Sequence, residues 1–222
     1  MKKKFCLIVV SVLVLSVVAG CQKNQAKTFK KIKTLKVSCE AKDLTNRKKV
    51  KISYNVDGSP KEVTVQISSR KVKNASDAAS VLMSTRKIFK ITGKDFYCIG
   101  KDTGRKKYDL YFLGQLYKGI PVEKGFFNVY VTKKGKTVSI SGQYQRGIHL
   151  SVDPKLSKKQ ALEHVKAGHH KGTAKLVIYP KDNGILAYKC SIRDDYNHII
   201  AYTYIDAHTG KQIAKQQVQY NL

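Results

Sequence analysis

Short runs in which apolar and polar residues alternate recur along this sequence, and they constrain its fold more than any other feature. One pair of runs covers residues 50–56 and 63–67, and Asp57-Gly58-Ser59-Pro60 lies between them. A period of two is typical of a strand with one buried face, and the four residues between the runs favour a tight turn. The pattern predicts a β-hairpin near residues 50–68.

Similar runs predict further strands in the rest of the chain. Residues 108–116 favour one strand, and a second hairpin turns at Lys134-Gly135. The strands of that hairpin are marked by Phe127, Val129, Val131, Val138 and Ile140. Four more strands are predicted at residues 176–179, 185–192, 199–206 and 213–218. Asp194-Asp195 and Thr209-Gly210 are the expected turns between the last three.

Two segments have helical spacing instead. The first begins at Ser76, a suitable N-cap, and its apolar stripe is Ala78, Val81, Leu82, Thr85, Ile88 and Phe89. The second begins with Ser157 and Gln160, which form a capping box, and Gly168 is its expected end. Because strands are many and adjacent in sequence while helices are few, we predict the α+β class, with antiparallel sheets each packed with one helix.

The chain is strongly basic. Its 222 residues include 43 Lys and Arg against 15 Asp and Glu, which gives a formal charge of +28. Hydrophobic residues make up 42% of the chain, which is enough for a core and excludes extended disorder. The positive electrostatic field of such a chain favours acidic partners, namely phospholipid, anionic wall polymer, nucleic acid or an acidic protein. We expect no nucleic-acid partner, because no zinc-finger spacing or RNA-binding aromatic signature accompanies the charge.

The first twenty residues have the layout of an export signal. Three lysines precede an apolar stretch that is too short to span a membrane, and Val18-Ala19-Gly20-Cys21 resembles the lipobox of bacterial lipoproteins. The resemblance implies a signal peptide over residues 1–20, acylation of Cys21 and attachment to the extracytoplasmic face of the cell membrane. The alternative is a plain signal peptide with an incidental cysteine.

Residues 21–36 are the expected lipid anchor and basic tether. The segment carries Lys27, Lys30, Lys31, Lys33 and Lys36. Each basic residue close to an anionic membrane gains about 1 kcal/mol, so the segment is expected either to lie against lipid headgroups or to act as a solvated spacer.

Two stretches, in a fixed order, resemble the propeptides of thermolysin-like secreted metalloproteases. The first is Gln115-Leu116-Tyr117-Lys118-Gly119-Ile120-Pro121-Val122, and it continues through residues 127–131, Gly135 and residues 141–144. The second runs from residues 158–162 to Tyr204-Ile205-Asp206-Ala207-His208-Thr209-Gly210-Lys211, an ending similar to that of PepSY domains. The resemblance spans about residues 76–219.

What this resemblance implies is a tandem of an FTP-like (fungalysin/thermolysin propeptide) domain over residues 76–150 and a PepSY-like domain over residues 151–222. Residues 37–75 form an N-terminal hairpin region outside the family pattern. The motif residues are expected to specify the fold and to catalyse nothing: Gln115, Tyr117, Gly119, Pro121, Gly135, Gly142, Tyr204, Asp206, Thr209 and Gly210.

The motif residues also have a physical interpretation. Gly119 lets the chain leave one strand sharply, and Pro121 removes a ladder donor. Asp206 can accept hydrogen bonds from downstream backbone amides, and Gly210 can supply a positive φ. Glu123-Lys124 departs from the family, which has an aromatic residue and a glycine there.

The sequence offers little for catalysis or metal binding. His-Glu-x-x-His does not occur, and His164 and His169 are five residues apart, so they do not share one helical face. His169-His170 is interpreted as an exposed helix end. We therefore expect no enzyme activity, no metal and no cofactor. Of Cys39, Cys98 and Cys190, two could form a disulfide, or all three could be buried; burial is favoured slightly, with Cys190 at an inward strand position.

The leading functional hypothesis is a lipid-anchored module that binds a secreted thermolysin-like metalloprotease in trans and inhibits it or assists its folding. A preformed sheet surface and the tail at residues 216–222 would cover the substrate cleft. The alternative is a basic cell-envelope lipoprotein that binds anionic wall polymer or phospholipid and has no protease partner.

Overall fold

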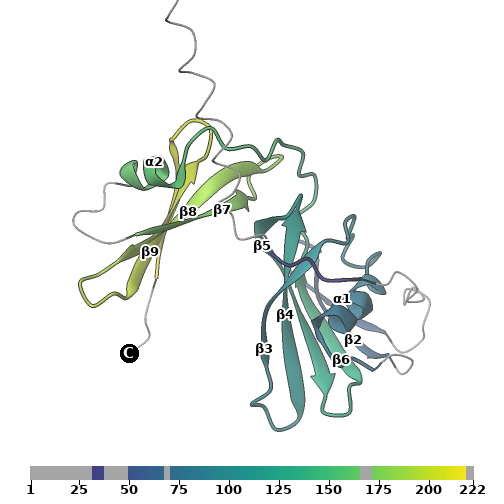
Figure 1. Ribbon diagram of the computed structural model, residues 1–222. Coiled ribbons are helices and arrows are strands. Elements are labelled where there is room, and N and C mark those ends of the chain that lie inside the picture. The colour runs from purple at the N-terminus through teal and green to yellow at the C-terminus, as the bar shows by residue number, and fades with distance from the viewer. Residues whose placement is uncertain (1–31, 38–49, 68–70, 166–171, 219–222) are drawn as a thin grey trace, which may run out of the picture. The chain divides into compact units, whose positions relative to one another are not determined.

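The computed structural model describes residues 32–37, 50–67, 71–165 and 172–218 (Figure 1). Ten strands join into one sheet, accompanied by two helices in the described ranges. Neither of these helices has the length and apolar character needed to cross a membrane. The predicted signal peptide, Cys21, Cys39 and His169-His170 lie outside the described residues.

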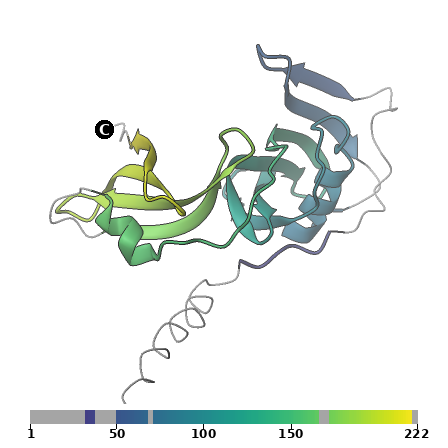
Figure 2. The ribbon, with the colours of Figure 1, turned by 90° about the horizontal axis from the view of Figure 1, so that it is seen from above.

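Six strands form the first half of the sheet, in the spatial order β1-β2-β6-β5-β4-β3, and all neighbours are antiparallel. They are β1 (Lys51–Tyr54), β2 (Pro60–Ile67), β3 (Phe96–Asp102), β4 (Tyr108–Tyr117), β5 (Ile120–Thr132) and β6 (Thr137–Gln143). The predicted hairpin near residues 50–68 is confirmed as β1 and β2, which Figure 2 shows in blue at one end of the sheet. The predicted hairpin around Lys134-Gly135 is confirmed as β5 and β6.

Four strands form the second half, as the sequence predicted. They are β7 (Thr173–Tyr179), β8 (Ile185–Arg193), β9 (Ile199–Asp206) and β10 (Gln212–Gln217), each antiparallel to the next. The halves meet where β5 pairs with β7 through Val122 and Ile178, and this pair is parallel. The sheet is therefore mixed, which corrects the prediction of purely antiparallel sheets.

The first helix, α1 (Ala75–Met83), begins and ends elsewhere than predicted. Its N-cap is Asn74, whose side chain accepts a hydrogen bond from the Asp77 amide at 3.0 Å, and not Ser76. The helix stops before Thr85 because the hydroxyls of Ser84 and Thr85 donate to the carbonyls three residues earlier, which favours tighter turns over helix. The predicted stripe out to Phe89 is nevertheless buried, except for Ile88, which is partly buried against the same cluster.

The second helix, α2 (Lys158–Glu163), has the predicted capping box. The Ser157 hydroxyl accepts from the Gln160 amide at 3.3 Å, and the Gln160 side chain accepts from the Ser157 amide at 2.8 Å. Helix α2 ends at Glu163 with His164 as its C-cap, earlier than Gly168, which is outside the described residues.

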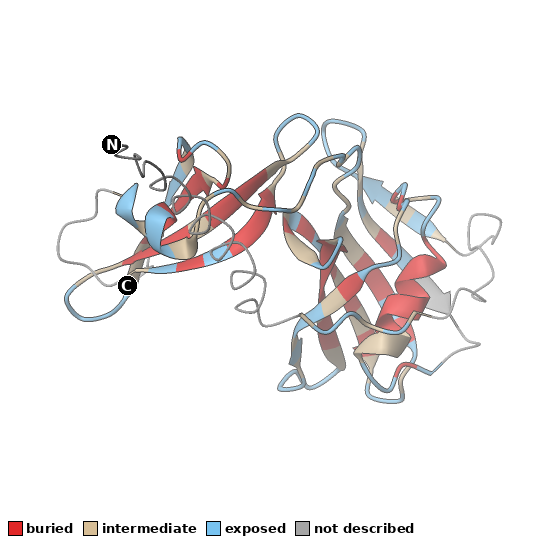
Figure 3. Cartoon of the chain, turned by 45° about the horizontal axis from the view of Figure 1, so that its top comes forward, coloured by how far each residue is buried: buried red, intermediate tan, exposed pale blue. Residues whose placement is uncertain are grey.

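Each half contains its own apolar cluster, shown red in Figure 3. In the first, α1 residues such as Leu82 pack with Phe127, whose ring meets Phe89 edge-on at 5.2 Å. In the second, Ala161 of α2 packs with residues of β7, β8 and β9. A third, smaller cluster in the second half contains Val177, Ala187 and the motif residue Tyr204, so separate clusters in the two halves position the strands that carry the motif residues.

Candidate binding surfaces

The β4–β5 connection is a two-residue turn. Lys118 and Gly119 have φ values of +49° and +82°, and Tyr117 pairs with Ile120 across the turn. Positive φ at both central residues is the geometry that fits the right-handed twist of a hairpin, and glycine adopts it without steric cost. Gly119 therefore makes the sharp exit from β4 that the sequence predicted, and Pro121 follows it in β5 opposite Leu116.

Gln115 ties β4 to the segment that leaves β6. Its side chain is 2% exposed, its Nε2 donates to the Gln145 carbonyl at 2.8 Å, and its Oε1 accepts from the Gln145 amide at 2.8 Å. Gly125 on β5 lies beneath it: a Cβ there would come within 2.5 Å of Gln115 Oε1. The amide side chain thus acts like an extra rung of the backbone ladder, and Gly125 leaves room for it.

Two glycines shape the β5–β6 hairpin. Gly135 occupies the turn with φ +81°, and its carbonyl accepts from the Val72 amide at 2.9 Å. Gly142 has φ +137°, and a Cβ there would lie 2.2 Å from the Phe126 carbonyl oxygen. Both positions require glycine for backbone reasons, the first for the turn and the second for the close approach of β5.

The turn after β9 has the predicted hydrogen bonds. Asp206 Oδ1 accepts from the amides of His208 and Thr209, both at 2.8 Å, and Gly210 has φ +75°. A Cβ on Gly210 would lie 2.6 Å from His164 Nε2, so the glycine also makes room for the residue that caps α2.

Glu123, the position at which the sequence departs from the family pattern, connects the two halves. Its carboxylate accepts from Lys189 Nζ at 2.9 Å and from the Tyr204 hydroxyl at 2.8 Å. Lys189 also lies over the Tyr202 ring, 4.5 Å from its centroid. Burial, and then the hydrogen bond to Glu123, raises the pKa of Tyr204 well above its ordinary value, so this hydroxyl stays protonated and donates. The role of Tyr204 in this contact could not be read from the motif.

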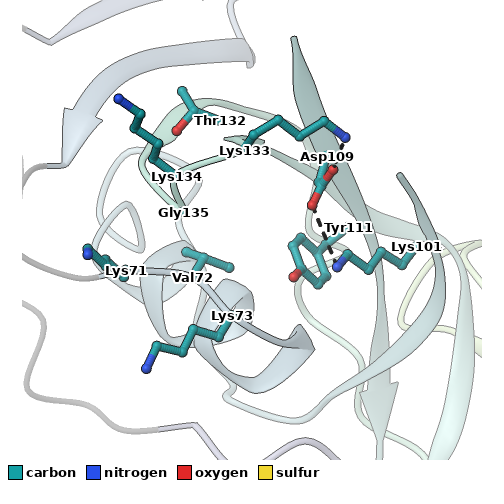
Figure 4. Close-up of a pocket in the computed structure, with 10 residues that line it drawn as sticks. All are labelled: Lys71, Val72, Lys73, Lys101, Asp109, Tyr111, Thr132, Lys133, Lys134 and Gly135. Carbon is teal, nitrogen blue, oxygen red and sulfur yellow. Dashed lines mark hydrogen bonds and ion pairs between the residues drawn. The ribbon is translucent and has the colours of Figure 1, made fainter. Parts of the chain in front are cut away.

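A pocket of about 310 Å³ opens beside the β5–β6 turn (Figure 4). The segment before α1, β3, β4 and the turn line it with Lys71, Val72, Lys73, Lys101, Asp109, Tyr111, Thr132, Lys133, Lys134 and Gly135. Five of these ten residues are lysines, and Asp109 is the acid among them. We refer to these residues as the lysine pocket.

Asp109 is already paired within the lysine pocket. Lys133 Nζ donates to its carboxylate at 2.5 Å, and Lys101 Nζ lies 3.6 Å away. The hydrogen bond from Lys133, with the charges of both lysines, lowers the pKa of Asp109, so the carboxylate is ionised at neutral pH. Lys101 also lies 5.0 Å from the centroid of the Tyr111 ring.

One comparison matches the strands described above. Residues 110–144 resemble the Fungalysin/Thermolysin Propeptide Motif. The match covers nearly all of β4 and the whole of β5 and β6, including Gln115, Gly119, Gly135 and Gly142. The resemblance noted in the sequence is therefore found independently for this part of the chain.

Two solved structures share some similarity with the chain. The Bacillus megaterium YpeB C-terminal domain is 16% identical, with a TM-score of 0.40, and the match covers 77% of this chain and 76% of that one. YpmB protein from Bacillus subtilis is 19% identical, with a TM-score of 0.23, over 55% of this chain and 85% of that one. No curated protein matches the sequence.

In the part of the chain that the structure describes, the remaining polar residues do not converge on a metal site. Within the described ranges, no three His, Cys, Asp or Glu side chains group closely enough to hold a metal ion. His198 pairs with Asp194 at 3.3 Å in the β8–β9 turn, and His208 contacts the Asp153 carbonyl at 3.0 Å.

The two described cysteines have opposite environments. Cys190 is fully buried, as predicted, and burial raises its pKa to about 11. Cys98 is exposed, so the prediction that all three cysteines are buried is wrong for this one. Cys98 lies on β3, which pairs with β4 alone at an edge of the sheet and in which Phe96 is the one buried residue. The two thiols are free and do not form a disulfide with each other.

This contrast predicts selective alkylation. With iodoacetamide at pH 8 we expect Cys98 to react within minutes and Cys190 to stay unmodified, because a buried thiol with a pKa near 11 has almost no thiolate and no access. Peptide mass mapping distinguishes the two sites, and unfolding in guanidinium should make both reactive. Equal labelling of the two in the native protein would contradict the burial of Cys190.

Proposed function

We propose that this chain is a lipid-anchored, extracytoplasmic binding module that acts in trans on a secreted thermolysin-like metalloprotease, as an inhibitor or folding modulator. The observation that carries the proposal is the match of residues 110–144 to the propeptide motif over β4, β5 and β6. A propeptide binds its enzyme and performs no reaction, which is the role proposed for this chain.

The construction of these strands supports a binding role. The motif residues fix the backbone of these strands: Gly119 and Gly135 make turns, and the Gln115 side chain forms hydrogen bonds with the Gln145 backbone. A surface that is fixed before binding loses little conformational entropy when a partner docks. The strands thus offer a preformed face for covering another protein's cleft.

Charge and anchoring complete the proposal. Without residues 1–20 and their three lysines, 40 basic and 15 acidic residues remain, and this net charge of +25 would accelerate association with an acidic enzyme surface more than it would strengthen the complex. Acylation of Cys21 with two or more chains would hold the module stably at the membrane, since one chain alone binds marginally. The enzyme would then meet its modulator at the cell surface.

The test is inhibition in solution. Residues 22–222, without the anchor, should slow peptide hydrolysis by a thermolysin-like protease at micromolar concentration or below, and should elute with it as a complex in gel filtration. The matched control is an equally basic protein without the motif, at the same ionic strength, because charge alone attracts acidic enzymes. Absence of both inhibition and complex across several such enzymes would refute the proposal.

A further inference from the structure

The lysine pocket concentrates positive charge that the protein does not neutralise. Lys101 and Lys133 share Asp109, whereas Lys71, Lys73 and Lys134 pair with no carboxylate in the described part of the chain. Figure 4 shows the ammonium groups of these three along one side of the pocket and the Asp109 cluster on the other. Like charges held together are unfavourable unless an anion joins them.

The backbone keeps these lysines close together. The Val72 amide donates to the Gly135 carbonyl at 2.9 Å, and the Val72 side chain, 5% exposed, is anchored in the core. Because Val72 points inward, its neighbours Lys71 and Lys73 remain outside, next to the turn that carries Lys134. The β5–β6 turn is closed by the Gly135 amide, which donates to the Thr132 carbonyl at 2.8 Å. These two chain segments therefore fix where the side chains of Lys71, Lys73 and Lys134 start, while the ammonium groups can adjust to a ligand.

The donors in the lysine pocket fit one ligand class better than others. Each lysine is a flexible point charge with three donors, without the planar fork by which arginine matches a carboxylate. The Tyr111 and Thr132 hydroxyls add donors that are not charged. Several ammonium groups around one space suit a tetrahedral anion with three or four acceptor oxygens and up to two charges.

We propose that the lysine pocket binds a phosphoryl group. Lys71, Lys73 and Lys134 contact its oxygens. Lys101 and Lys133, which pair with Asp109, add positive charge on the opposite side of the pocket. The phosphoryl group belongs either to a soluble phosphate or to the phosphodiester headgroup of a lipid. This site is independent of the proposed action on a protease, and either proposal can fail without the other.

The experiment compares two triple variants of the full chain in a non-ionic detergent by titration calorimetry with pyrophosphate. The pocket variant is Lys71→Gln, Lys73→Gln and Lys134→Gln. The control variant is Lys155→Gln, Lys181→Gln and Lys215→Gln, three exposed lysines in the second half, so both variants lose the same charge. We expect the pocket variant to lose at least tenfold in affinity and the control to change less than twofold. Equal losses, or no binding of pyrophosphate by the unaltered chain, would overturn the proposal.

Two further probes test whether the ligand is a phosphoryl group and whether it comes from a lipid headgroup or from a soluble phosphate. Citrate, with three carboxylates, should bind more weakly than pyrophosphate, and equal affinity would contradict a phosphoryl site. Glycerophosphoglycerol carries the phosphodiester of a lipid headgroup. If its binding also depends on the three pocket lysines, the source is a headgroup; if only pyrophosphate depends on them, the source is a soluble phosphate. Unchanged melting of the pocket variant without ligand establishes that the fold is intact.

Discussion

Replacing Gly142 by alanine should destabilise the protein by about 3 to 4 kcal/mol, through strain and overpacking together. Gly142 has φ +137°, a conformation that residues with a side chain rarely adopt. The added Cβ would also lie 2.2 Å from the Phe126 carbonyl oxygen and 2.7 Å from Phe127 Cα. Both contacts are to backbone, so the hairpin cannot relieve them by rotating a side chain.

The control is Gly147→Ala. Gly147 also has a positive φ, +70°, but a Cβ there would meet nothing within 4 Å. It should therefore cost only the left-handed backbone penalty of about 1 kcal/mol. Urea unfolding followed by circular dichroism gives both values. A loss for Gly142→Ala no larger than that for Gly147→Ala would mean that β5 and β6 are not so closely packed at this point.

The sequence alone predicted the elements that have a regular period. Alternating or continuous apolar runs located β1, β2 and β4 to β10, because each of these strands places apolar side chains in or against one of the clusters. It missed β3, whose register shift between Cys98 and Gly100 breaks the period. It placed the α1 N-cap two residues late, because Asn74 and Ser76 are both good caps and only the contacts of the folded chain distinguish them.

Features that join distant segments could not be predicted. The parallel pair at Val122 and Ile178 involves residues far apart in sequence, and no local period marks it. The sequence marked Glu123 only as a departure from the propeptide pattern, yet its carboxylate accepts hydrogen bonds from both Lys189 and Tyr204. The lysine pocket likewise could not be predicted, because it brings together lysines from separate segments of the chain. Each short basic run, such as Lys133-Lys134, is by itself typical of an ordinary solvated turn.

Replacing Gln115 by alanine should lower the free energy of unfolding by about 3 kcal/mol, part from the cavity and part from unpaired polar groups. Gln115 is buried, and its side chain satisfies both the amide and the carbonyl of Gln145 at 2.8 Å. The control is Gln143→Ala, an exposed position on β6, which should change stability by less than about 0.5 kcal/mol.

Gln115→Glu separates the hydrogen bonds from the packing, because it keeps the shape of the side chain. An ionised carboxylate still accepts from the Gln145 amide, but it presents an oxygen to the Gln145 carbonyl, to which Gln115 Nε2 donates at 2.8 Å. Burial and this repulsion raise the pKa of the new carboxyl in the folded state, so its protonated form, which can donate, is favoured. Relative to the unaltered chain at the same pH, the variant should be nearly as stable at pH 4 and lose stability as pH rises toward 7. A deficit that does not change with pH would show that this side chain matters for its volume and not for its two hydrogen bonds.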